Sequence, residues 1–207
     1  NVDAAGIRPG SKEGRRILFV GRNFVRKGGP LVVQAFTILR KKYLWSAELY
    51  LAGAKESDIR DALRERQIRV EEADWQKIHL LGDLGSEKLT DYYNLCDVFC
   101  MPSYFEAYGL VFAEALTYGL PCIGRDKFAM SEFIEDGCTG RLISGEDAEE
   151  LALDLWEVLQ DPKYREEVER RREWYLREYS WDKVAQRICS VMEKNERDKD
   201  QYRSAGV

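Results

Sequence analysis

Short apolar segments that alternate with helical segments constrain the fold of this 207-residue chain more than any other feature. Each apolar segment has the length and the branched side chains of a buried strand, and most end at glycine or proline. The predicted strands are residues 16–20, 47–52, 77–81, 98–101, 120–123 and 141–143. Between them lie helical patterns at 30–42, 57–68, 86–95 and 110–118, and charged helices follow from residue 147. This alternation predicts an α/β fold, a Rossmann-like, doubly wound parallel sheet of about six strands.

Composition narrows the classes of function. The formal charge of −5 and the isoelectric point near 5.2 argue against a nucleic-acid partner, because such binding needs a basic surface. No segment approaches the roughly 18 apolar residues of a membrane span. Five cysteines without a C-x-x-C pair, together with a single histidine, argue against a metal site and favour reduced thiols in a cytoplasmic protein.

The chain divides by composition into three parts. Residues 1–14 are polar and rich in glycine, and we interpret them as a lead-in or linker. Residues 15–195 form the predicted ligand-binding domain, and residues 196–207 form a charged tail. Because the chain does not start with methionine, we expect it to be cut from a longer protein. The Asp198-Lys199-Asp200 sequence could suggest a metal site, but a solvated tail explains it more simply.

The loop after the first strand carries the first candidate site. Gly21 and Arg22 follow the strand directly, and Lys27 precedes Gly28. Ligands of parallel sheets bind beyond the carboxyl ends of the strands, where two cations beside glycines suit a diphosphate. Neither a G-x-G-x-x-G nor a P-loop pattern is present, and solvated surface charge is the alternative explanation.

The second candidate site surrounds the apolar helix at 110–118. Glu114 is the only charged residue between Ala107 and Gly124, and a carboxylate in apolar surroundings needs a partner or a ligand. Glu106 precedes the helix, and Gly109 lets a ligand approach the free N–H groups of its first turn. The alternative is that Glu106 caps the helix and Glu114 forms a structural salt bridge.

These motifs resemble those of the retaining GT-B glycosyltransferases of group 1. Glu106 and Glu114 match the family's E-x7-E pattern, and the loop from Gly21 to Gly28 resembles its G-R-x4-K-G diphosphate loop. The resemblance covers roughly residues 15–195. Further matches follow in order and spacing at 97–103, 108–111, 115–121, 132 and 136–140. The chain is thus similar to the C-terminal, donor-binding half of a GT-B fold.

The resemblance implies a role for each matched residue. Gly21, Arg22 and Lys27 would hold the donor diphosphate, and the backbone of Gly109, Leu110 and Val111 would hold the distal phosphate. Glu114 would accept the ribose hydroxyls, and Glu106 would contact the transferred sugar. Main-chain contacts at Leu81, Gly82 and Asp83 would bracket the base, and the helix at 181–194 would cross to the other domain. The implied catalytic residues are Arg22, Lys27 and Glu106.

The implied reaction transfers a sugar from a nucleoside diphosphate to an acceptor hydroxyl with retention, without a metal or other cofactor. The partners would be the nucleotide-sugar donor and an N-terminal acceptor-binding domain, without which the chain should be inactive. That missing half could also bring the cytoplasmic protein to the inner face of a membrane. Two alternatives stay open: half of a nucleotide-sugar epimerase, or a non-catalytic nucleotide-binding domain in which Glu106 and Glu114 are satisfied internally.

One position departs from the family's pattern. The family often has two glycines four and three residues before the acid that matches Glu132, whereas this chain has Phe128 and Ala129. The side chains there argue against close backbone contact with the sugar and predict a narrower pocket.

Overall fold

Six parallel strands form one sheet in the order β3-β2-β1-β4-β5-β6 in the computed structural model, which describes residues 6–8, 13–180 and 182–192. Every neighbouring pair of these strands is parallel. The predicted doubly wound sheet of about six strands is therefore confirmed. The strands are β1 (Arg16–Val20), β2 (Glu48–Ala52), β3 (Ile78–Gly82), β4 (Val98–Cys100), β5 (Cys122–Arg125) and β6 (Gly140–Ile143).

The order of the strands reverses next to β1. The chain moves outward from β1 through β2 to β3, returns to β4 on the other side of β1, and continues outward to β5 and β6. Ile17 of β1 is in register with Val98 of β4, and Val20 of β1 with Ala52 of β2. Loops at the carboxyl ends of β1 and β4 therefore leave the sheet in opposite directions, which opens the crevice where such sheets bind ligands.

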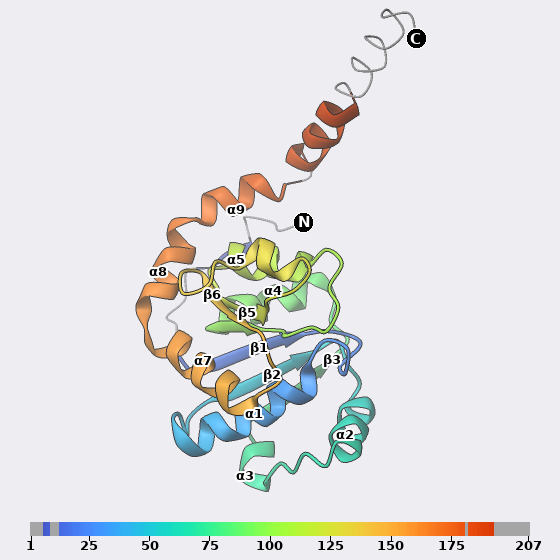
Figure 1. The fold of residues 1–207 in the computed structure, drawn as a ribbon, viewed down its shortest axis with the longest axis vertical. Helices are drawn as coiled ribbons and strands as arrows, with labels where there is room; N and C mark the ends of the chain where they lie inside the picture. Colours follow the sequence, from blue (N-terminus) through green and yellow to red (C-terminus); the bar gives the residue numbers. More distant parts are fainter. Residues whose placement is uncertain (1–5, 9–12, 181, 193–207) are drawn as a thin grey trace, which may run out of the picture.

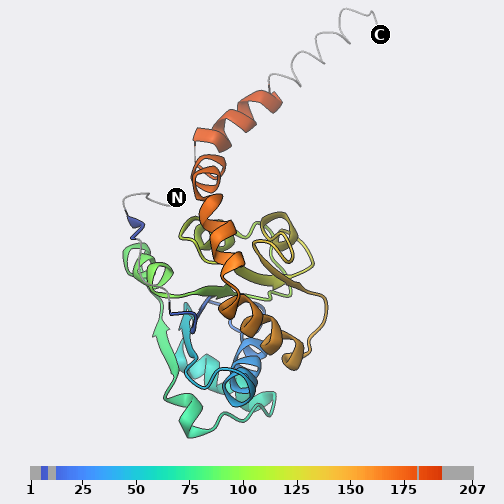
Figure 2. The ribbon, with the colours of Figure 1, turned by 90° about the vertical axis from the view of Figure 1, so that its left-hand side faces the viewer.

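Helices cover both faces of the sheet (Figure 1). Helices α1 and α7 pack side by side on one face, and α4 and α5 lie on the other. From α7 the chain continues through α8 and α9, which pack against α5, and on into the helical residues 182–192 (Figure 2). The helices are α1 (Gly29–Lys42), α2 (Glu56–Glu65), α3 (Glu72–Trp75), α4 (Ser86–Leu95), α5 (Leu110–Thr117), α6 (Met130–Phe133), α7 (Ala148–Gln160), α8 (Pro162–Arg170) and α9 (Arg172–Glu178).

The core lies on both sides of the two central strands. Ile17, Leu18 and Phe19 of β1 are fully buried, and so are all three residues of β4. Burial on both faces explains why these strands are continuous apolar runs rather than alternating patterns. Each such side chain contributes about 1.5–3 kcal/mol when it is removed from water.

Two predicted elements, the strand at 120–123 and the helix at 57–68, were wrong by two residues or more, and local turns explain where β5 starts and α2 ends. Strand β5 starts at Cys122 instead of Leu120, because the Leu120 N–H still donates to the carbonyl of Ala115 at the end of α5 (2.9 Å). Helix α2 ends at Glu65 instead of residue 68, where Gln67 takes a left-handed φ of 56°. The Ile68 N–H then donates to the Leu63 carbonyl (2.9 Å), which is a common way to close a helix.

The structure tests few of the expectations about the two ends of the chain. The charged tail at 196–207, with Asp198-Lys199-Asp200, lies outside the described residues, as does most of the lead-in at 1–14. In the part of the chain that is described, none of the helices combines the length and the apolar character needed to cross a bilayer. Cys96, Cys100 and Cys122 are buried, as expected, whereas Cys189 is exposed.

Candidate functional site

The loops that follow β1 and β4 meet at the point where the strand order reverses. The Tyr104 N–H donates to the Arg26 carbonyl (2.9 Å), and the Arg26 guanidinium donates to the Phe105 carbonyl (2.6 Å). The Ser103 hydroxyl also donates to the Phe105 carbonyl (2.9 Å). The two bonds of Arg26 tie together loops almost 80 residues apart in sequence, so the two sequence motifs form one site.

Lys27 and Glu106 form an ion pair across this junction. The Lys27 Nζ donates to Glu106 Oε2, and the two side chains retain only 14% and 12% of their exposure. The other carboxylate oxygen, Oε1, accepts the Gly109 N–H (3.2 Å). The residue predicted to hold a diphosphate and the residue predicted to contact the sugar are therefore direct partners in this structure.

Two helices start at the same place without a side-chain cap. Helix α1 has Gly28 as its N-cap (φ 80°), and α5 has Gly109 (φ 78°). A Cβ on Gly28 would lie 2.4 Å from the Pro102 carbonyl oxygen, so both backbone angle and space require glycine. Leu110, which is about half exposed, and Val111 begin the first turn of α5, as predicted. The N-termini of two helices favour an anion here, and only the one at α5 was predicted. At α5 the Glu106 carboxylate already accepts the Gly109 N–H, as the capping alternative for Glu106 expects.

Arg22 and Asp83 are also partners, at the exposed edge of the site. The Arg22 Nε and Nη2 each lie 3.2 Å from one oxygen of the Asp83 carboxylate, and the side chains are 80% and 64% exposed. Leu81 and Gly82 end β3, and the Gly82 carbonyl accepts the Gly53 N–H (2.7 Å). Such an exposed pair is worth about 0–1 kcal/mol, so an anionic ligand could displace Asp83 from Arg22.

Glu114 has a partner that the sequence did not reveal. The Tyr93 hydroxyl donates to Glu114 Oε2 (3.0 Å) from helix α4. Burial, and then the negative charge of Glu114, raise the pKa of the Tyr93 hydroxyl well above its ordinary value. No Lys or Arg among the described residues forms an ion pair with Glu114, and a carboxylate can accept further hydrogen bonds. The alternative of a structural salt bridge at Glu114 is therefore not what the structure shows.

Arg125 is a further cation that sequence reasoning missed. It ends β5 and is 96% buried, with Nη1 donating to the Gly145 carbonyl (2.7 Å). Its guanidinium lies 4.7 Å from the ring centroid of Tyr104, whose hydroxyl donates to Glu146 (3.1 Å). Arg125 thus links the loops after β4 and β6 beneath the site. A basic residue at the end of an apolar strand was the available signal.

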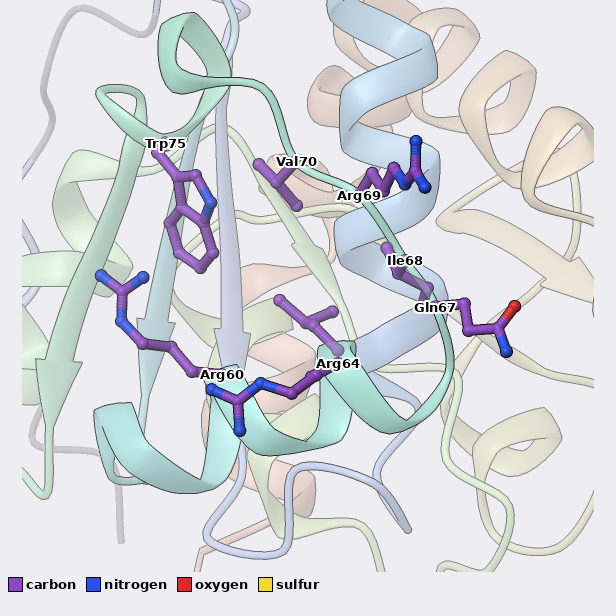
Figure 3. A pocket seen from close by; sticks show the side chains of 8 residues that line it. Arg60, Arg64, Gln67, Ile68, Arg69, Val70 and Trp75 are labelled. Carbon is purple, nitrogen blue, oxygen red and sulfur yellow. The ribbon is translucent and has the colours of Figure 1, made fainter.

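One hollow lies beside the loop after β4, and another lies at the margin of the sheet. The first, of about 400 Å³, is lined by Ala107, the residue after Glu106, and by Glu132, the residue matched to the family's acid, together with Tyr108, Phe133 and Tyr179. The other, of about 520 Å³, lies between α2 and α3 (Figure 3). Two of its three arginines have partners nearby: Arg60 pairs with Glu56 (2.7 Å) and lies over Trp75, and Arg64 pairs with Asp61 (2.8 Å). None of the predicted site residues lines this second hollow.

No metal centre is visible within the described ranges. No three side chains of the His, Cys, Asp or Glu type come together there as a metal site. The positive charge of the candidate site comes instead from Arg22, Lys27 and the two helix N-termini.

Sequence comparisons match this chain to known proteins over most of its length. The family described as glycosyl transferases group 1 matches residues 7–174. A phosphatidyl-myo-inositol mannosyltransferase from Mycolicibacterium smegmatis is 27% identical over 88% of this chain and 46% of its own length. A D-inositol 3-phosphate glycosyltransferase from Paenarthrobacter aurescens is 29% identical over 87% of this chain and 43% of its own. The chain thus spans less than half the length of these relatives.

Solved structures show the same fold. The pneumococcal O-GlcNAc transferase, in complex with UDP and GlcNAc, matches with a TM-score of 0.69 and 23% identity, over 87% of this chain and 36% of its own. An Anabaena protein in complex with UDP-glucose matches with a TM-score of 0.72 and 18% identity, over 86% and 48%. This chain belongs to the group 1 glycosyltransferases, and its six-stranded parallel sheet is that of the C-terminal half of their GT-B fold.

Proposed function

We propose that this chain binds the nucleoside-diphosphate sugar donor of a retaining glycosyltransferase. The observation that carries the proposal is that Lys27 and the glycine-capped N-termini of α1 and α5 lie where the strand order reverses, with Arg22 in the same loop as Lys27. Such a site favours a ligand with two adjacent negative charges. The relatives solved with UDP or UDP-glucose support a nucleoside diphosphate as that ligand.

The chemical role of this half is electrostatic. As the bond from the sugar to the diphosphate breaks, negative charge develops on the leaving diphosphate. Fixed cations and helix N-termini stabilise that charge without reorganising, and a divalent metal is not needed for it. Arg22 is the more accessible cation, whereas Lys27 must share its charge between Glu106 and the donor.

The two glutamates would orient the donor. Glu106, held by Lys27 and by the Gly109 N–H, stands beside the proposed diphosphate site and would accept a hydroxyl of the transferred sugar. We assign it an orienting role and not that of a nucleophile. Glu114 keeps acceptor capacity beside its bond from Tyr93 and would accept the ribose hydroxyls. Main-chain groups at Leu81 and Gly82, with Asp83, would bracket the base.

The acceptor would bind to an N-terminal domain. This chain spans less than half of each relative named above, and we propose that the remaining part supplies the acceptor site. The isolated chain should therefore bind a donor weakly and transfer no sugar. Detection of sugar transfer by the purified chain to an added acceptor would contradict this division of labour.

One observation favours a second function, a non-catalytic nucleotide-binding domain. That alternative predicts that both glutamates are satisfied internally, and Glu106 and Glu114 each have a partner within the chain. The two functions differ in what they require of Glu106. In a glycosyltransferase its substitution should weaken binding of the sugar-bearing donor more than binding of the bare diphosphate, whereas a nucleotide-binding domain should show no such difference.

The test is a panel of UDP-, GDP- and ADP-sugars, with the bare diphosphates, measured by thermal shift and calorimetry. Nucleotides with one of the three bases should bind and raise the melting temperature of the chain. Arg22→Ala should weaken that binding by roughly ten- to hundredfold, because a charge-assisted hydrogen bond is lost. Since Arg22 is 80% exposed, its replacement should leave the melting temperature almost unchanged. If none of the diphosphates binds, or if Arg22→Ala binds as wild type does, the proposed site is wrong.

A further inference from the structure

Phe128 has a backbone conformation that large side chains rarely adopt. Its φ is 58°, in the left-handed region, within the turn that joins β5 to α6. For a bulky residue this is a genuine outlier, and strained residues of this kind are often found at ligand sites. Since glycine would adopt this angle freely, the phenylalanine needs an explanation in what its ring does.

The ring of Phe128 packs against Phe105 beside the candidate site. The two centroids are 5.1 Å apart in an edge-to-face arrangement, and each residue remains 50% exposed. Edge-to-face contacts stabilise an aromatic pair without burying it. The structure therefore keeps two apolar rings in a defined position at the surface.

Both rings are anchored to the loop that carries Glu106. Phe105 is the preceding residue, and its carbonyl accepts hydrogen bonds from Arg26 and Ser103. On the other side, the Ala129 N–H, next to Phe128, points to the Glu106 carbonyl at 3.4 Å. The aromatic pair is thus fixed next to the residue that would contact the transferred sugar.

We propose that the Phe105–Phe128 pair is one wall of the transferred-sugar subsite and selects a deoxy sugar. The inference rests on the proposed function, because that function places the sugar at Glu106. A sugar hydroxyl pressed against these rings would lose its hydrogen bonds to water without replacement, whereas a methyl or C–H group would gain apolar contact. The pair should therefore favour a hexose that lacks the hydroxyl facing it.

The experiment compares matched donors by calorimetry on the whole chain. The probes are UDP, UDP-glucose, and the four UDP-glucose analogues that lack the hydroxyl at C2, C3, C4 or C6. In the wild-type chain at least one analogue should bind about fivefold or more tightly than UDP-glucose, the effect of one unreplaced hydrogen bond. In Phe128→Gly that preference should disappear, while UDP affinity changes by less than about twofold.

A matched control separates the ring from the backbone strain. Gln67 has nearly the same left-handed φ, 56°, but it lines the hollow between α2 and α3 instead of the candidate site. Gln67→Gly should relieve a similar strain yet keep the wild-type preference among donors. Phe105→Ala, which changes no strained residue, should weaken the preference in the same direction as Phe128→Gly.

Three results would overturn the inference. It is wrong if no deoxy analogue binds more tightly than UDP-glucose, or if Phe128→Gly and Phe105→Ala keep the wild-type preference. In both cases UDP still binds, so the proposed diphosphate site stands. If GDP or ADP binds the wild-type chain instead of UDP, the same analogue series is measured with that base. If none of the three diphosphates binds, the proposed function and this inference fail together.

Discussion

The ion pair between Lys27 and Glu106 should support the fold as well as the ligand site. Removing one partner of a buried pair costs about 3–5 kcal/mol, because the other charge is left buried without compensation. The side chains here keep 14% and 12% of their exposure, which allows some access to water. We therefore expect Lys27→Met or Glu106→Gln to lower the free energy of unfolding by roughly 2–4 kcal/mol.

A double-mutant cycle measures this coupling directly. Urea denaturation of both single variants and of Lys27→Met/Glu106→Gln should show that the double variant loses much less than the sum of the singles. For a domain of this size the singles should melt roughly 5–15 °C lower. Arg22→Met is the matched control, because its pair with Asp83 is exposed and should contribute at most about 1 kcal/mol. Additive losses in the double variant, or single losses no larger than that of the control, would refute the reasoning.

The same variants separate stability from ligand binding. Glu106 competes with a diphosphate for Lys27, so Glu106→Gln should bind UDP at least as tightly as the wild type despite its lower melting temperature. Lys27→Met should bind UDP roughly ten- to hundredfold more weakly. If Glu106→Gln and Lys27→Met weaken UDP binding equally, the Glu106 carboxylate and the diphosphate do not compete for Lys27.

Three further predictions concern the second glutamate, metals and pH. Glu114→Gln should leave the melting temperature as high as before and weaken donor binding by about 1–3 kcal/mol; a large drop in melting temperature with unchanged affinity would make Glu114 a framework residue. Donor titrations with and without a chelator should give the same dissociation constant. Strict dependence of donor binding on magnesium or manganese would contradict the proposal that binding needs no metal. The pKa of Tyr93 is raised by burial and by Glu114, so the stability linked to its hydroxyl is complete below about pH 10 and is lost as the pH rises further. Urea denaturation across this range should show a smaller alkaline loss for Tyr93→Phe than for wild type, and equal losses would contradict the assignment.

Local sequence patterns determined the elements and the place of the site. The apolar runs of β1 and β4 mark strands because burial on both faces leaves no room for alternation. The motifs at Arg22, Lys27, Glu106 and Gly109 follow strand ends, and parallel strands bring their carboxyl ends to one edge. These inferences need only neighbouring residues and the general rules of parallel sheets.

The partners of the site residues were decided by tertiary structure. Lys27 and Glu106 are 79 residues apart, and Tyr93 and Glu114 are 21 apart, on different helices. Sequence alone therefore left open whether Glu106 and Glu114 wait for a ligand or are satisfied within the chain, and the fold gives each of them a partner.

The backbone conformation of the turn at Phe128 could not be predicted from the sequence either. Phe128 was recognised as a departure from the family's pattern, but its left-handed φ and its contact with Phe105 depend on how β5 and the Glu106 loop pack. A sequence pattern reports burial and local propensity. The identity of a contact across the sheet depends on strand order and register, which the whole core determines together.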